Sequence, residues 1–529
     1  MSQSAVSDRF STQQGLLPTL MFGLVLIAGI AYSGQQMLVD LSAATSMEAM
    51  PYIVLGIALL IALGFEFVNG FHDTANAVAT VIYTNSLPPS AAVVWSGLCN
   101  LAGVLTSSGA VAFGILSLLP VELILQVGSQ SGLAMVFSLL LAAILWNLGT
   151  WYLGLPASSS HTLIGSIIGV GLMNQIMAPA GSATSGIDWS QATKVGYSLL
   201  LSPLVGFAAS ALLLFAARKL LAKSAHLFEA PEGRKPPPLL IRGLLVLTCS
   251  GVSFAHGSND GQKGMGLIML ILIGSVPTAY ALNRAVEPSY VQTFTAASEQ
   301  AMGVYDRLAG SGVAIASADE ARTAVTAYLR SHQAEPATVP ALRRLGSEIV
   351  ANVTQFPSLA QLPASQMPNI RNDIYLESDA LRLLSKNQDI AAADHKILDT
   401  YKKNLDHATR FIPPWVKVAV ALALGLGTMV GWKRIVVTVG EKIGKAHLTY
   451  AQGASAELVA MTTIGLADGL GLPVSTTHVL SSGVAGTMAA NRSGLQWDTV
   501  RNLALAWVLT LPVSIALSGG LFWLLRHLF

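Results

Sequence analysis

The chain has 529 residues, of which 52% are hydrophobic and 11% are charged, and its net charge is +2. A soluble protein carries about a quarter charged residues, so this composition excludes an ordinary soluble protein and predicts a polytopic, all-α membrane protein in the lipid bilayer. The low net charge implies no nucleic-acid partner. The two cysteines, Cys99 and Cys249, lie in apolar segments, which argues against a disulfide framework or a thiolate metal site.

We predict that residues 1–50 contain one extra transmembrane helix, which precedes the repeated membrane part of the chain. Met1–Gln14 is polar, and the apolar run Leu16–Leu38 is longer than the core of a signal peptide and lacks a convincing cleavage site. About 20 apolar residues span a bilayer, so this run is long enough. We assign this helix no functional role.

Residues 51–217 predict a first membrane repeat with four clear spans. A fifth segment, Pro156–Met177, is rich in glycine and serine and predicts a re-entrant hairpin or a short broken span. The four expected spans are Pro51–Thr84, Ser90–Leu118, Leu133–Leu153 and Val195–Ala217.

Residues 218–238 form a basic, proline-rich linker, which we expect on the cytoplasmic side because short basic loops stay there. The second repeat is expected to begin at 239–283 and to resume at 411–529. The polar segment 284–410 between these parts predicts an extramembrane helical insert on the outer face, in the periplasm if the cell is Gram-negative. Amphipathic helices are expected within it at Ala318–Ser331 and Asp373–Leu384. The later spans are Pro413–Trp432, Tyr450–Leu470, Pro473–Ala490 and Val500–Leu525.

A cluster of polar residues interrupts the first long span, at Glu66, Asn69, His72, Asp73 and Asn76. A charge at membrane depth costs about 3 kcal/mol or more, so such residues usually face a cavity and have a function. A glycine inside the cluster weakens the helix and predicts a break there. The alternative is a capping aspartate in a loop near the membrane interface.

The cluster recurs in the second half, at His256, Asn259, Asp260, Gln262 and Lys263. When the two copies are aligned on their aspartates, Asn69 falls on His256, His72 on Asn259 and Asn76 on Lys263.

A second motif is also duplicated, and it combines glycine, proline, hydroxyl side chains and histidine. It reads Gly154-Leu-Pro-Ala-Ser-Ser-Ser-His-Thr162 in the first half and Gly471-Leu-Pro-Val-Ser-Thr-Thr-His-Val479 in the second. Two motifs repeated in the same order indicate internal duplication, which is typical of secondary transporters with a site at the repeat interface. We therefore predict two inverted repeats with broken helices and re-entrant Ser/Thr-rich segments.

The hydroxyl-rich segments favour an oxyanion as ligand. Helix starts present free backbone N–H groups and a positive dipole end to an anion. The expected anion-binding residues are Ser158, Ser159, Ser160 and Thr162 in the first half and Ser475, Thr476 and Thr477 in the second. The alternative is a helix start that only packs against its neighbours, since small residues are common at membrane helix contacts.

Together the four motifs resemble the inorganic phosphate transporter (PiT) family, most closely its bacterial low-affinity, proton-coupled branch. The resemblance rests on four segments, Asn69–Thr84, Gly154–Gly165, His256–Gly264 and Pro473–Ser482. The resemblance covers both membrane halves from about Pro51, but not the first fifty residues, and it is loose in the insert. It implies low-affinity uptake of inorganic phosphate across the inner membrane, with no cofactor and no enzymatic reaction.

The aspartates suit the coupling ion better than the anion. In sodium-coupled relatives, equivalent Asp and Asn side chains hold Na⁺, and this sequence keeps Asp73, Asn76, Asn259 and Asp260. It departs from that pattern at His72 and Lys263. A histidine with a pKa near ~6.5 exchanges protons in the physiological range. We therefore expect H⁺ coupling, with Na⁺ as the alternative.

Glu66 and Asn69 are further candidates for the proton path, and His161, His478, His256 and Gln262 for support of the site. Lys263 is either a fixed counter-charge beside Asp260 or a direct phosphate ligand.

The resemblance also implies a neutral complex of phosphate with a divalent cation such as Mg²⁺ as substrate, and a homodimer, but the residues identify no metal ligands. Rival interpretations are sulfate transport on the same fold, an intramembrane hydrolase and a phosphate sensor. The duplication disfavours the hydrolase, and the lack of a sizeable cytoplasmic domain disfavours the sensor.

Overall fold

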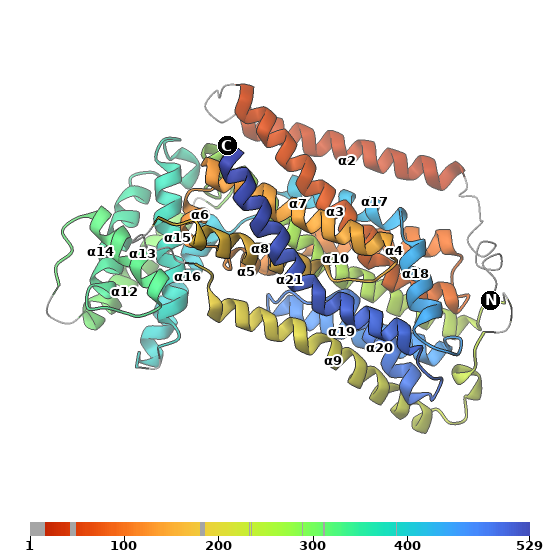
Figure 1. Cartoon of the computed structure of the whole chain (residues 1–529). Helices are drawn as coiled ribbons and strands as arrows, with labels where there is room; N and C mark the ends of the chain where they lie inside the picture. Colours follow the sequence, from red (N-terminus) through yellow and green to blue (C-terminus); the bar gives the residue numbers. More distant parts are fainter. Residues whose placement is uncertain are drawn as a thin grey trace.

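The computed structural model describes residues 16–42, 49–179, 186–231, 233, 235–287, 289–309, 313–387 and 389–528. Within these ranges the side chains of residues 16–19, 21–22, 49–51, 71 and 73–76 are not described. The polar start Met1–Gln14 lies outside these residues. The described part is built from helices (Figure 1). The first half contains α2 (Leu16–Ser42), α3 (Ala49–Tyr83), α4 (Pro89–Thr106), α5 (Ala110–Leu116), α6 (Val121–Leu125), α7 (Gln130–Tyr152), α8 (Ser159–Ile176) and α9 (Trp189–Leu220).

The second half begins with α10 (Leu239–Ser275) and α11 (Pro277–Tyr280). The insert follows with α12 (Tyr290–Leu308), α13 (Ala318–Ser331), α14 (Thr338–Val353), α15 (Met367–Leu384) and α16 (Ala392–Thr409). The chain then continues through α17 (Pro414–Met429), α18 (Lys433–Val437), α19 (Tyr450–Gly469), α20 (Thr476–Ala490) and α21 (Trp497–Leu528).

The predicted all-α, polytopic membrane architecture is confirmed. Seven helices of the described chain are long and apolar enough to cross a membrane, and a bent pair, α16 with α17, meets the same test across its break. One predicted span is wrong in extent. The segment Ser90–Leu118 is not one helix, because α4 ends at Thr106 and the left-handed Gly109 separates it from the short α5.

Helices of the first half pack against helices of the second half. α8 of the first half packs against α21, and α20 of the second half packs against α9. Likewise α4 lies against α10, while α17 lies against α3. A side chain at Gly103 would collide with the carbonyl of Phe254, and one at Gly427 with the carbonyl of Phe67. Each contact therefore has a counterpart, as a duplicated chain requires, while the opposite membrane orientation of the two halves stays a prediction.

The helix breaks do not fall where the polar clusters predicted them. α3 and α10 run without interruption through Asp73 and Asp260. The glycines of these clusters allow close helix contact instead, since a side chain at Gly70 would strike the backbone of Leu424 and one at Gly257 the backbone of Asn100. The breaks lie before α8 and α20, in the Ser/Thr-rich segments.

The insert forms a separate helical body at one end of the molecule (Figure 1). Its helices enclose their own core, which includes Phe294, Leu345 and Tyr401. The helix predicted at Ala318–Ser331 is confirmed as α13, and Asp373–Leu384 falls within α15.

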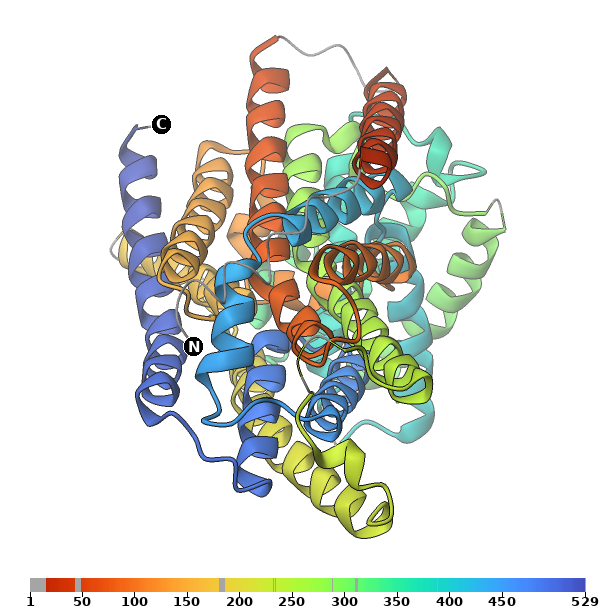
Figure 2. The ribbon, with the colours of Figure 1, turned by 90° about the vertical axis from the view of Figure 1, so that its right-hand side faces the viewer.

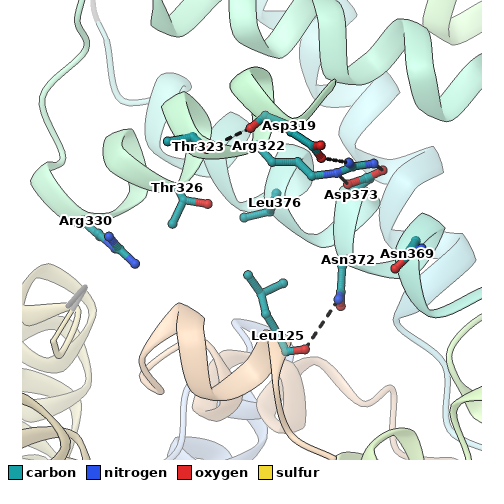
Figure 3. Close-up of a pocket in the computed structure, with 10 residues that line it drawn as sticks. All are labelled: Leu125, Asp319, Arg322, Thr323, Thr326, Arg330, Asn369, Asn372, Asp373 and Leu376. Atoms are coloured by element: carbon teal, nitrogen blue, oxygen red, sulfur yellow. Dashed lines mark hydrogen bonds and ion pairs between the residues drawn. The ribbon is translucent and has the colours of Figure 1, made fainter. Parts of the chain in front are cut away.

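Ion pairs join the insert to the first half of the chain. Arg330 pairs with Glu122 of α6 at 2.7 Å, and Arg382 pairs with Asp188 before α9 at 3.0 Å. A cavity of about 540 Å³ lies at the α6 contact, where Asn372 reaches the carbonyl of Leu125 (Figure 3).

The basic linker and α18 lie at the end of the membrane body opposite the insert (Figure 1). Figure 2 views the molecule from that end and shows α2 at the periphery of the helix bundle. This arrangement agrees with the expected placement of insert and basic loops on opposite sides of a membrane, which stays a prediction.

Candidate functional site

The starts of α8 and α20 are built alike. Ser158 and Ser475 are the N-cap residues, and their hydroxyls accept hydrogen bonds from the backbone N–H of His161 at 3.2 Å and of His478 at 3.1 Å. The chain turns into each cap through a glycine with positive φ, +69° at Gly154 and +66° at the equivalent Gly471. The matched motifs thus produce matched local structure.

These two helix starts face one another. The rings of His161 and His478 lie 4.6 Å apart, and Ser160 donates a hydrogen bond to the carbonyl of Val474 at 2.6 Å. The segment before each helix is held from the other half of the molecule. Trp507 of α21 donates to the carbonyl of Pro156, and Ser198 of α9 donates to that of Pro473.

Lys263 and Asp260 of α10 reach into this junction. The lysine Nζ lies 2.6 Å from Oδ2 of Asp260 and 2.5 Å from Oγ of Ser160, and Ser159 donates to the same carboxylate at 3.2 Å. All four side chains are buried. The structure therefore joins the α10 motif to the α8 hydroxyls around one ion pair.

The junction brings two helix N-termini together. The first N–H groups of a helix have no partner inside that helix, and they carry the positive end of its dipole. Among the described side chains, Thr476 Oγ1, His161 Nδ1 and Asn259 Oδ1 are buried without a hydrogen-bond partner from the protein. Buried polar atoms normally require a partner, so the site offers unused hydrogen-bonding capacity to water or a ligand.

The two remaining anion-site candidates are Thr162 and Thr477. Thr162 donates to Oδ1 of Asn147 at 2.9 Å and is thereby tied to α7. Thr477, predicted as a ligand from the second half, is fully buried in the first turn of α20.

The first polar cluster is placed only in part. His72 lies 3.2 Å from the hydroxyl of Thr150 of α7, and Asn69 donates to Glu66 at 3.5 Å. The Glu66 carboxylate packs directly on Gly264, next to Lys263, where any side chain would collide with it. The side chains of Asp73 and Asn76 lie outside the described residues, so their predicted roles stay predictions.

Two of the predicted supporting residues, His256 and Gln262, have side-chain partners in the protein. His256 lies 2.7 Å from Oδ1 of Asn100, and its other ring nitrogen is 3.7 Å from Asp260. Gln262 donates to Asp468 at 2.7 Å, and the Asn259 amide donates to the carbonyl of Leu472 at 3.1 Å. They position α10 against α4 and against the segment before α20.

Sequence reasoning missed a buried carboxylate at Glu457. It lies in α19 and accepts hydrogen bonds from Thr80 of α3 and Thr248 of α10, so it links the helices that carry both polar clusters. The sequence alone could have identified Glu457, because an acidic residue inside an apolar span is a candidate functional residue. Asp468 and the amides Asn100 and Asn147 were missed as well.

The comparisons with known proteins match both halves. Residues 69–518 match the model of the phosphate transporter family. The chain is 44% identical over 489 residues to the low-affinity inorganic phosphate transporter PitA of Escherichia coli (strain K12), covering 89% of this chain and 97% of PitA. It is 42% identical over 496 residues to PitB of the same strain, covering 90% and 98%.

A solved structure described as the sodium-dependent phosphate transporter matches with a TM-score of 0.49 at 17% identity, over 90% of this chain and 100% of that chain. The family match extends from the first polar cluster into α21 and leaves out α2. This multi-pass membrane protein therefore belongs to the phosphate transporter family, a family of transporters rather than enzymes.

Proposed function

We propose that this protein imports inorganic phosphate with low affinity by symport with H⁺, through the junction between α8 and α20. The observation that carries the proposal is the pair of matched helix starts that face one another beside Lys263. Two N-termini and a ring of hydroxyls can replace the hydration shell of a phosphate ion. The names of PitA and PitB support phosphate as the substrate.

Proton coupling is supported by the ion pair. With Lys263 Nζ at 2.6 Å from Asp260, the ammonium occupies the position beside this carboxylate that a Na⁺ ion needs. Because Lys263 already supplies the positive charge at this position, we infer that the coupling ion is a proton. The candidates for proton exchange on α3 are His72, Glu66 and Asp73. Na⁺ symport remains the alternative coupling.

The proposal also includes the chemical form of the substrate, the membrane in which the protein lies and its oligomeric state. Phosphate is carried as a neutral complex with a divalent cation such as Mg²⁺, the protein sits in the inner membrane, and two copies form a homodimer. A neutral complex suits a site that already holds a balanced ion pair, because it brings no further net charge into the membrane.

The test is uptake of radiolabelled phosphate into proteoliposomes, with a pH gradient or a Na⁺ gradient imposed separately, each with and without Mg²⁺. We expect uptake with the pH gradient, and loss of uptake in Asp73→Asn and Asp260→Asn. Asp319→Asn is the matched control, since it makes the same chemical change on an exposed residue of the insert.

The outcomes separate the parts of the proposal. Uptake driven only by Na⁺ would overturn the proton coupling and leave phosphate transport intact. Uptake that does not respond to Mg²⁺ would overturn the metal complex. Transport of sulfate in place of phosphate would overturn the substrate assignment.

A further inference from the structure

α2 lies outside the match to the transporter family, and the transport site gives it no role. Only 6% of its apolar span is buried in the molecule. It contacts α17 along one edge, where Gly29 meets Leu422 and Ser33 donates to the carbonyl of Trp415 at 3.3 Å. Its remaining surface carries exposed Leu24, Ile27 and other large apolar side chains, which face lipid in a bilayer.

A cavity of about 490 Å³ lies at the end of α2 nearest the insert. Its walls come from the last turns of α2, from α11, from the start of the insert and from the segment that leads into α17. Four aromatic residues line it: Tyr32, Tyr280, Phe411 and Trp415. Aromatic rings with a polar tip favour the boundary between acyl chains and headgroups.

The position of the cavity relative to the apolar spans agrees with this boundary. The apolar span of α2 ends at Ser42, two residues after the cavity residue Asp40. The chain leaves α10 for the insert and bends by 73° on its return from α16 into α17 at the same place. The cavity therefore opens where the membrane spans give way to the polar insert.

Among the described residues that line the cavity, Asp40 is acidic and Arg284 is basic. Oδ2 of Asp40 accepts hydrogen bonds from Tyr280 at 2.9 Å and from the Trp415 indole at 3.0 Å, which fixes the carboxylate against the aromatic wall. Within the described part of the chain, Arg284 donates one hydrogen bond, from Nη2 to the carbonyl of Ala360 at 3.0 Å. This leaves further guanidinium donors for a ligand, since an arginine has five N–H groups.

We propose that this cavity binds the headgroup of a zwitterionic phospholipid with a primary ammonium, phosphatidylethanolamine, whose acyl chains run along the exposed face of α2. The ammonium binds Asp40 and the aromatic faces, and the phosphate diester binds Arg284. Cations are attracted to aromatic faces, and guanidinium groups match phosphate oxygens. An anionic lipid brings no cation for Asp40, and the site therefore disfavours it.

The test is native mass spectrometry of the purified, delipidated full-length protein with added dioleoyl phosphatidylethanolamine, phosphatidylcholine or phosphatidylglycerol. We expect the ethanolamine lipid to bind at least about tenfold more tightly than the glycerol lipid, a difference of about 1.4 kcal/mol. Asp40→Asn and Arg284→Gln should each weaken its binding by a similar factor. Asn at position 40 still accepts from Tyr280 and Trp415, so the docking of α2 is preserved.

The matched controls are Asp306→Asn and Arg343→Gln, which make the same charge changes at an exposed ion pair of the insert. They should bind the lipid as the wild type does. Equal binding of phosphatidylglycerol, or unchanged binding in both cavity variants, would overturn the proposal. If phosphatidylcholine binds equally well, the site does not require a primary ammonium, and that part of the proposal is wrong. If water-soluble glycerophosphoethanolamine competes equally well, the site does not require a lipid, and the proposed occupant is wrong.

Discussion

Lys263 and Asp260 form an ion pair within α10. Both side chains are fully buried within a membrane-spanning helix, at an N–O distance of 2.6 Å. Removing one partner of such a pair leaves an uncompensated charge and costs about 3–5 kcal/mol, whereas replacing both partners is far less costly.

We therefore expect Lys263→Met to lower the thermal stability of the detergent-solubilised protein strongly, and the double variant with Asp260→Asn to recover most of that stability. Neither should transport phosphate. Lys402→Met is the control, because Lys402 pairs with Asp406 at the same 2.6 Å but at a partly exposed site of the insert. Equal losses in the two single variants would show that burial does not govern this pair.

The N-cap serines allow capping to be separated from anion binding. Asn and Asp both cap helices about as well as Ser, so either change at Ser475 should preserve α20. Asp adds a negative charge at the proposed anion site, and at a distance of about 4 Å this repulsion is worth several kcal/mol inside a protein. We expect Ser475→Asn to keep most of the phosphate uptake and Ser475→Asp to raise the KM at least about tenfold. Equal KM values would place the anion elsewhere.

At the scale of elements, the insert contains its own buried acid. Glu377 of α15 is fully buried and accepts a hydrogen bond from Tyr305 at 3.1 Å. Burial disfavours the ionised form and raises the pKa of Glu377 from its usual 4.5 to about 8. The neutral carboxyl therefore belongs to the folded insert.

The stability of the insert should consequently fall as the pH rises. Because the pKa is raised on folding, the stabilisation is complete below about pH 4.5 and is lost up to about pH 8, at about 1.4 kcal/mol per pH unit. Hydrogen exchange of α12 and α15 peptides, corrected for intrinsic rates, should show less protection at pH 7.5 than at pH 5. Glu377→Gln should remove the difference, and its persistence would assign the effect to another group.

Two glycines, Gly70 and Gly257, lie inside the long helices α3 and α10 without breaking them, although glycine is a weak helix former. Each glycine accepts the backbone of another helix at close range, which compensates for its poor helix propensity. Sequence alone could not distinguish this use of glycine from a break, because the partner backbones lie far along the chain.

For the whole molecule, the exchanged packing of α8 and α20 unites the two halves. The predicted opposite placement of linker and insert can be tested by labelling intact cells with a membrane-impermeant maleimide. In a background with Cys99 and Cys249 replaced by Ala, we expect labelling of Glu299→Cys in the insert and no labelling of Lys223→Cys until the cells are permeabilised. Labelling of both positions, or the reverse pattern, would contradict the topology.

The sequence by itself determined the membrane class, the duplicated motifs and the residues proposed for the site. These features are local, because apolar runs set the spans and each motif is contiguous in the chain. It also predicted the contact between Lys263 and Asp260, which lie one helical turn apart.

Only the tertiary structure decided which groups meet across the two halves. Ser160 reaches Lys263 and Val474, and Glu457 reaches Thr80 and Thr248, through contacts between residues more than a hundred positions apart. Such contacts depend on which helix faces pack together, and hydropathy does not encode that choice. For the same physical reason, the cavity beside α2 could not be found from the sequence, since four separate segments build its walls.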